Sequence, residues 1–138
     1  MSTHKGRILC TEDDLDTCEL ITLVLQTEGY EVVTTQSTAD ALDLAQSQPF
    51  DLYLVDTRLP GMSGAELTEK LREFDAKTPV LFYSAAAYES DKQKAREAGA
   101  QGYLVKPVSH DVLIFEVARL IAKAQISVAL KVVVPPKD

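Results

Sequence analysis

The sequence predicts an α/β fold in which a five-stranded parallel sheet is covered by helices on both faces. Short apolar segments of strand length alternate with longer segments whose apolar residues recur every three or four positions. This alternation repeats five times along 138 residues, a length that suits one domain with its own hydrophobic core. Such a pattern builds a doubly wound parallel sheet by right-handed crossovers.

Five segments have the length and composition of strands. They are rich in β-branched and aromatic residues and are separated by polar or turn-forming residues. The third and fourth are almost wholly apolar, as strands buried on both faces should be. The segments are "RILCT" (7–11), "YEVVTT" (30–35), "DLYLVD" (51–56), "PVLFYS" (79–84) and "GYLVK" (102–106).

Helical periodicity fills the intervals between the strands. Gly29 follows the first helical segment, and glycine is typical of the position just after a helix. Ser37, Ser63 and Ser109 precede three further helical segments, where a serine hydroxyl can cap the first turn. The predicted helices cover 15–28, 38–46, 64–74, 88–99 and 110–124.

Composition and charge narrow the classes of function. Fourteen basic residues against 21 acidic ones give a net charge of −7, which argues against direct nucleic-acid binding and favours cations and basic partners. No apolar run approaches the roughly 18 residues that cross a bilayer, and the N-terminus does not resemble a signal peptide. Cys10 and Cys18 lack metal-ligand spacing and are expected to be buried free thiols in a cytoplasmic protein.

Reactive polar groups stand at the ends of the predicted strands. Ligands of such sheets bind at the carboxyl ends of the strands, near the point where strand order reverses. Glu12 and Asp13 follow the first strand, and Asp56, Ser84 and Lys106 end the third, fourth and fifth. Carboxylates that converge repel one another unless a cation lies among them. We therefore expect Mg²⁺, a hard cation that binds oxygen ligands.

This set of groups is typical of phosphoryl transfer to a carboxylate. A cation at the carboxylates keeps Asp56 ionised, and a carboxylate can act as a nucleophile toward a phosphoryl group. The cation and Lys106 would screen the charge that develops during transfer. The Ser84 hydroxyl can donate a hydrogen bond to a phosphoryl oxygen of the product.

The motifs together resemble the receiver domain of two-component response regulators over about residues 5–124. The matching segments are "ILCTEDD" (8–14), "LYLVDTRLPGMSG" (52–64), "VLFYSA" (80–85) and "GYLVKP" (102–107), in this order. The resemblance implies the flavodoxin-like strand order 2-1-3-4-5. It also implies a phosphorelay in which Asp56 is phosphorylated by a sensor histidine kinase or a histidine phosphotransfer protein.

The resemblance implies a role for each site residue. Asp56 is expected to be the phosphoacceptor. Asp13, Glu12 and Asp56 are expected to hold Mg²⁺, with the backbone carbonyl of Arg58 as a further ligand. Lys106 is expected to pair with Asp56 and then with the phosphoryl group.

Three further residues are implied to shape the response. A cis peptide bond before Pro107 would set the position of the preceding lysine. Ser84 and Tyr103 resemble a switch pair, in which the hydroxyl moves toward the phosphoryl group while the ring turns inward. The surface that binds a downstream protein would consist of the helix over 88–99, the strand over 102–106 and the helix over 110–124.

The leading hypothesis is thus a phosphorylation switch that catalyses only its own phosphotransfer and dephosphorylation and is otherwise not an enzyme. The alternative is a pseudo-receiver that acts as a constitutive protein-interaction module, because Glu12 is one methylene longer than aspartate and could loosen the metal site. An aspartyl phosphatase would need a second aspartate where Arg58 stands. A flavin carrier would need a hydroxyl-rich phosphate loop where "TEDDLDT" (11–17) is acidic.

The C-terminal segment differs from the rest of the chain. We assign residues 1–125 to the receiver domain and 126–138, "ISVALKVVVPPKD", to a tail. The tail is either a disordered end or a slight extension of the last helix. Exposed apolar residues are costly, so we expect Val128, Leu130 and residues 132–134 to pack against the domain or a second subunit of a homodimer.

Overall fold

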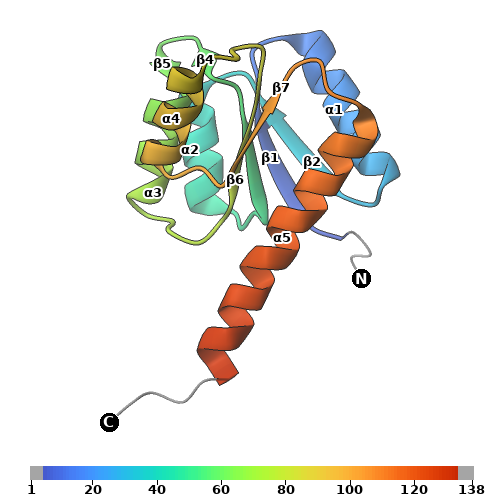
Figure 1. Cartoon of the computed structure of the whole chain (residues 1–138), viewed down its shortest axis with the longest axis vertical. Helices are drawn as coiled ribbons and strands as arrows, with labels where there is room; N and C mark the ends of the chain where they lie inside the picture. Colours follow the sequence, from blue (N-terminus) through green and yellow to red (C-terminus); the bar gives the residue numbers. More distant parts are fainter. Residues whose placement is uncertain (1–4, 134–138) are drawn as a thin grey trace.

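The computed structural model describes residues 5–133, with side chains through residue 128, and has the predicted architecture (Figure 1). Its main sheet contains β1 (Arg7–Thr11), β2 (Glu31–Thr35), β3 (Leu52–Val55), β6 (Val80–Ser84) and β7 (Gly102–Val105). The strands pair in the order β2-β1-β3-β6-β7, all parallel. Counting these five alone gives 2-1-3-4-5, so the predicted strand order is confirmed. The order reverses next to β1, which places the ends of β1 and β3 side by side.

Helices cover both faces of this sheet (Figure 1). α1 (Leu15–Thr27) and α5 (His110–Val133) pack on one face. α2 (Thr38–Ser47), α3 (Gly64–Arg72) and α4 (Glu89–Ala98) pack on the other. Within the part of the chain that the structure describes, no helix combines the length and the apolar character needed to cross a bilayer.

Alternate residues of each strand supply the two layers of the core. Ile8 and Cys10 of β1 face α1 and α5, whereas Leu9 between them faces α2, α3 and α4. This is the two-residue period of a strand. Cys10 and Cys18 are buried and free, as the sequence predicted. A sheet covered on both faces leaves its carboxyl edge as the place where polar side chains can reach solvent.

The predicted serine caps are present at three helices. Ser37 accepts a hydrogen bond from the backbone N–H of Asp40, and Ser63 accepts one from Glu66. The Ser109 hydroxyl accepts the N–H of Val112 at 3.2 Å. Each cap satisfies one backbone donor that the first helical turn leaves unpaired.

A short hairpin is present that the sequence pattern does not predict. It consists of β4 (Arg58–Leu59) and β5 (Met62–Ser63), which pair antiparallel. Strands of two residues are too short to show a period. Gly61 in the turn has a φ of 79°, a conformation that glycine adopts without a steric penalty. The hairpin carries the chain from Asp56 to the start of α3.

Residues 126–133 of the predicted tail continue α5. α5 runs through residue 125 to Val133, and its last turns project beyond the sheet (Figure 1). β-Branched residues lower helix propensity by less than about 1 kcal/mol each, so a helix that is already formed extends through them. Val128 lines a groove with Phe50, Pro79 and Ile121. Leu130 and residues 132–134 lie outside the side chains that the structure describes.

A hydrogen-bond network lies at the end of the sheet where the strands begin. Asp75, in the loop after α3, accepts hydrogen bonds from the Tyr53 hydroxyl at 2.7 Å and from the N–H groups of Lys77 and Thr78 at 3.0 Å. Burial alone would raise the pKa of Asp75, but these hydrogen bonds outweigh burial and lower it. Asp75 therefore stabilises the folded state as a carboxylate.

Replacement of Asp75→Asn is expected to lower the free energy of unfolding by about 1–2 kcal/mol near pH 7, because charge-assisted hydrogen bonds are lost. Because the pKa of Asp75 in the folded state is below its unfolded-state value of about 3.9, the carboxylate stabilises the fold at pH values above the latter. This stabilisation is lost as the pH falls through the folded-state pKa. The difference from the parent chain should therefore shrink below about pH 4. Urea unfolding across this pH range measures it.

The exposed Asp43 of α2 offers a matched control, since Asp43→Asn should change stability by less than about 0.5 kcal/mol. A difference between Asp75→Asn and the parent that stays constant down to about pH 3 would contradict this account of the carboxylate.

Candidate functional site

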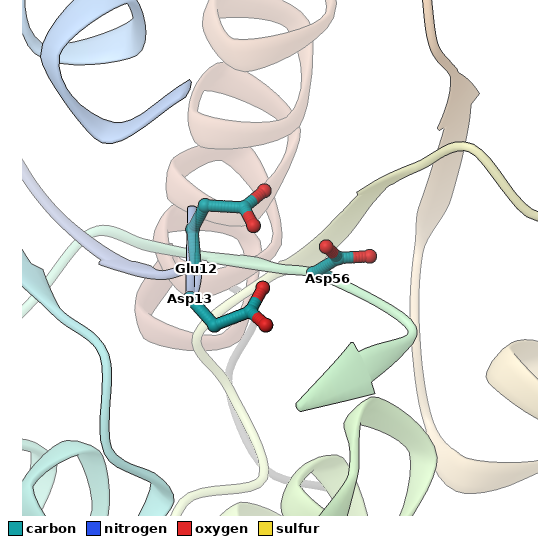
Figure 2. A group of neighbouring side chains, drawn as sticks. All are labelled: Glu12, Asp13 and Asp56. Atoms are coloured by element: carbon teal, nitrogen blue, oxygen red, sulfur yellow. The ribbon is translucent and has the colours of Figure 1, made fainter. Parts of the chain in front are cut away.

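Three carboxylates meet at the carboxyl edge of the sheet. Glu12 and Asp13 follow β1, and Asp56 follows β3, the neighbouring strand. One oxygen from each carboxylate lies within 4.8 Å of the other two. Figure 2 shows the carboxylates of Glu12 and Asp13 directed toward the side on which Asp56 lies. The convergence that the sequence predicted for these three residues is thus present.

The three carboxylates differ in their surroundings. Glu12 is 2% exposed, Asp13 is exposed, and Asp56 is intermediate. Glu12 accepts a hydrogen bond from the backbone N–H of Asp14 at 3.2 Å and one from the Lys106 ammonium. Burial raises the pKa of Glu12 to about 7, although both hydrogen bonds oppose the shift.

Lys106 reaches into the cluster from the end of β7. Its Nζ lies 2.7 Å from Oε1 of Glu12 and 3.6 Å from Oδ2 of Asp56. Lys106 therefore hydrogen-bonds to Glu12 and forms a longer ion pair with Asp56. The peptide bond between Lys106 and Pro107 is cis.

The donor set fits a hard divalent cation. One ammonium cannot neutralise three ionised carboxylates, so the cluster favours additional positive charge. The groups of Glu12, Asp13 and Asp56 that converge are oxygens, the ligand type that Mg²⁺ prefers. A cation at this position would also favour ionised Glu12 and so lower its pKa.

The cluster opens into a cleft of about 620 Å³. Strand ends form its floor, and the loop between β6 and α4 forms one wall. The cleft is lined by five of the residues that the sequence singled out, and Glu12 is not among its lining residues. Its lining residues are Asp13, Asp56, Arg58, Ser84, Ala85, Ala86, Ala87, Tyr88, Asp91 and Lys106.

Tyr103 lies behind the cleft wall with its ring directed inward. The ring stacks on Phe82, with ring centroids 5.6 Å apart and planes 6° from parallel. Its hydroxyl donates to the backbone carbonyl of Ala86 at 2.7 Å and lies 3.0 Å from Oγ1 of Thr57. Tyr103 thus contacts the loop after β6 and the residue next to the predicted phosphoacceptor.

Ala86 connects the two residues predicted as a switch pair. Ser84 is buried, and its Oγ accepts the N–H of Ala86 at 3.1 Å. The carbonyl of the same Ala86 holds the Tyr103 hydroxyl. The residue types of Ala86 and Thr57 do not predict these contacts, which arise from the tertiary fold.

Gly64 packs closely against the backbone of Asp56. A Cβ at Gly64 would lie 2.1 Å from the carbonyl oxygen of Asp56 and 2.9 Å from the Phe82 ring. Neither neighbour leaves room for a methyl group. Gly61 is a turn residue with a positive φ, whereas Gly64 is required by this close approach. A glycine directly after the helix-capping Ser63 was the available signal for close approach.

The fold and the site together have the features of a signalling domain of the two-component type. A doubly wound sheet with carboxylates after its first and third strands and a lysine after its fifth is the arrangement that the sequence resemblance implied. The family model described as "Response regulator receiver domain" matches residues 8–118, and the chain belongs to this family.

Individual relatives and structures agree with this assignment. The chain is 35% identical over 120 residues to the uncharacterized transcriptional regulatory protein YkoG of Bacillus subtilis, a match that covers 87% of this chain and 50% of YkoG. The chain spans about half the length of the curated relatives it matches.

Two solved structures show the same fold. One is a CheY-like response regulator receiver domain protein from Methanospirillum hungatei, with a TM-score of 0.84, 27% identity, and coverage of 88% of this chain and 97% of that one. The other is the receiver domain of the sensor histidine kinase PA1611 from Pseudomonas aeruginosa, with a TM-score of 0.79, 28% identity, and coverage of 85% and 98%. That structure has a magnesium ion coordinated in its active site cleft.

Replacement of Gly64→Ala is expected to lower the free energy of unfolding by about 2–4 kcal/mol, because the new Cβ forces Asp56 or the start of α3 to move. Gly61→Asn is the matched control, since nothing lies within 4 Å of a Cβ there and asparagine tolerates positive φ. It should cost less than about 1 kcal/mol. Urea unfolding compares the two, and equal losses would contradict a specific need for close approach at Gly64.

Proposed function

We propose that this chain is a Mg²⁺-dependent phosphorylation switch of a two-component pathway, with Asp56 as its phosphoacceptor. The observation that carries the proposal is the convergence of Glu12, Asp13 and Asp56 within 4.8 Å, beside Lys106 and open to a cleft. The donor would be a phosphohistidine of a sensor histidine kinase or of a histidine phosphotransfer protein. The donor imidazole would enter through the cleft that Asp13 and Asp56 line.

The metal site of this proposal uses the acidic cluster. Asp13, Asp56 and Glu12 would hold Mg²⁺, and the backbone carbonyl of Arg58, a residue of the cleft lining, would complete the protein ligands. The bound ion supplies charge compensation for the carboxylates and for the phosphoryl oxygens. Exposure of Asp13 gives a cation access from solvent.

The transfer step is a displacement at phosphorus. A carboxylate oxygen of Asp56 forms the O–P bond while the P–N bond to the donor imidazole breaks. The imidazole nitrogen keeps the electron pair and can then bind a proton from solvent. The Lys106 ammonium lies 3.6 Å from Oδ2 of Asp56. During transfer it would leave the Glu12 carboxylate, bind a phosphoryl oxygen and offset the negative charge that develops on that oxygen.

The contacts of Ala86 support a mechanism by which phosphorylation of Asp56 would change the protein surface. The Ser84 Oγ accepts a hydrogen bond from the Ala86 N–H. Rotation of the Ser84 side chain toward a phosphoryl oxygen would break this hydrogen bond. The carbonyl of Ala86 holds Tyr103 on β7. Phosphorylation would thereby shift the loop before α4 together with β7, and we propose α4, β7 and α5 as the face that binds a downstream protein.

As such a switch, the chain would catalyse only its own phosphotransfer and dephosphorylation and act on no other substrate. Its proposed location is the cytoplasm, where thiols such as those of Cys10 and Cys18 stay reduced. A constitutive interaction module is the second candidate. The 2.7 Å contact between Lys106 and Glu12 favours it, because that contact engages the lysine that phosphotransfer needs.

Mg²⁺ is expected to stabilise the chain, by about 2.7 kcal/mol at a free concentration of about 100 times the dissociation constant. Asp13→Asn should remove most of this stabilisation, since it removes a charged ligand. Asp14→Asn is the matched control, because Asp14 caps α1 by accepting the N–H of Thr17. Thermal unfolding with and without MgCl₂ measures the effect, and an equal response of both variants would contradict the assigned ligands.

Incubation with the small phosphodonor acetyl phosphate is expected to add one phosphoryl group, detected by intact mass, in the presence of Mg²⁺ but not of a chelator. Asp56→Asn should abolish the adduct because it removes the nucleophile. Asp51→Asn, which alters a carboxylate at the other end of β3, should retain it. An adduct that persists in Asp56→Asn would refute the assigned phosphoacceptor, and no adduct in the parent chain would favour the interaction module.

A further inference from the structure

The face of α5 that packs on the sheet continues beyond the end of the sheet. Leu120 and Ile121 on this face are buried. Ala124 and Val128 follow at helical spacing, but the residues across from them precede β3 and β6 rather than belonging to these strands. Val128 is 46% exposed. The last turns of α5 therefore leave apolar surface uncovered where they project from the domain (Figure 1).

A groove lies between these turns and the loops that lead into β3 and β6. Its first pocket has a volume of about 350 Å³, at the lower limit of small-molecule sites in proteins. The small side chain of Ala124 in its wall leaves this space unfilled. Apolar side chains form most of the lining, and they are those of Phe50, Pro79, Ile121, Ala124 and Val128.

A second pocket, of about 230 Å³, adjoins the first. Both pockets are lined by Lys77, Pro79, Ala124 and Val128. Lys123 also lines the second pocket, and no acidic residue of the described chain does. In the part of the chain that the structure describes, neither lysine ammonium pairs with a carboxylate. Two positive charges thus lie at one end of an apolar groove.

We propose that this groove binds a single-chain amphiphile with an anionic head, of the class of a medium-chain fatty acid. The alkyl chain lies in the first pocket, and the carboxylate binds Lys77 and Lys123. An ammonium binds a carboxylate through charge-assisted hydrogen bonds. The whole chain has a net charge of −7, so it attracts an anion only where cations gather locally.

Asp51 determines the direction in which the ligand lies. It lines the first pocket, and its carboxylate accepts a hydrogen bond from the Arg7 N–H at 2.7 Å. A ligand carboxylate in the first pocket would be repelled by Asp51, whereas the second pocket offers two cations. The apolar end of the ligand therefore lies toward Phe50 and its head toward Lys123.

The polar groups of the groove favour an alkyl chain over a peptide. The Thr78 hydroxyl already donates to the backbone carbonyl of Phe50 at 3.4 Å. The side-chain carbonyl of Gln101 already accepts hydrogen bonds from Arg72 and Val80. A peptide would bring N–H and C=O groups that need partners, and burying them without partners is costly. An alkyl chain needs no hydrogen bonds.

Decanoate, a carboxylate with an unbranched alkyl chain, is a suitable probe for this site. We expect a dissociation constant on the order of 100 µM, because the groove is open to solvent along one side and buries only part of the chain. This inference goes beyond the proposed function, since it depends on neither Asp56 nor a metal ion.

Titration of the full chain with sodium decanoate, followed by amide NMR, tests the proposal. Saturable shifts are expected at groove residues such as Thr78, Ala124 and Val128, and not at the acidic cleft. Each CH₂ removed from the ligand should raise the dissociation constant about 2- to 4-fold, because less apolar surface is buried. Decylammonium, which has the same chain and the opposite charge, should bind the groove at least about 10-fold more weakly.

Two pairs of variants locate the site. Ala124→Leu fills the groove and should raise the dissociation constant for decanoate at least about 10-fold, whereas Ala122→Leu, at an exposed position of α5, should change it less than about 2-fold. The double variant Lys77→Gln and Lys123→Gln should raise it about 3- to 10-fold. Lys94→Gln, on the exposed surface of α4, should change it less than about 2-fold. Circular dichroism shows that each variant is folded.

An absence of saturable shifts in the groove up to about 5 mM decanoate would overturn the proposal. Equal losses of affinity in Ala124→Leu and Ala122→Leu, or equal affinity of the groove for decanoate and decylammonium, would do the same. Binding to phosphatidylglycerol vesicles without any binding of free decanoate would point to a membrane surface as the partner, and would also overturn it.

Discussion

The crowding of carboxylates at one edge of the sheet is the constraint on which the rest of the structure depends. Because β1 and β3 are neighbouring parallel strands, the residues that follow them, Glu12, Asp13 and Asp56, lie close together. A protein selected for stability alone would not keep a nearly inaccessible glutamate beside two further acids. Two apolar layers, one on each face of the sheet, stabilise the fold well enough to hold this arrangement.

In the proposed function, the same crowding allows the site a second arrangement of its contacts. Lys106 is closer to Glu12 than to Asp56, so the lysine has a partner both before and after a phosphoryl group arrives. Ser84 likewise accepts a hydrogen bond from the Ala86 N–H, a contact that a phosphoryl oxygen on Asp56 would replace. Because Lys106 and Ser84 would both exchange a present partner for a phosphoryl oxygen, addition of one charged group can change several contacts at once.

Features that depend on local sequence could be predicted. The strands, the helices, the caps at Ser37, Ser63 and Ser109 and the convergence of the strand ends follow from periodicity and topology. Features that depend on tertiary contacts could not. The roles of Ala86 and Thr57 arise from a tyrosine distant in sequence, and the need for Gly64 arises from a backbone oxygen eight residues earlier. The boundary drawn at residue 125 falls inside α5, because the β-branched residues that follow are compatible with a continuing helix.

A crystal structure with Mg²⁺ and beryllofluoride, which mimics a phosphoryl group on an aspartate, tests the central claim most directly. The account predicts that the mimic lies on Asp56, that the metal contacts Asp13 and Asp56, and that Lys106 has moved from Glu12 to the mimic. A structure in which Lys106 still binds Glu12 and the mimic is absent from Asp56 would contradict it. The acidic cluster would then be a structural feature of a domain that acts through its surface alone.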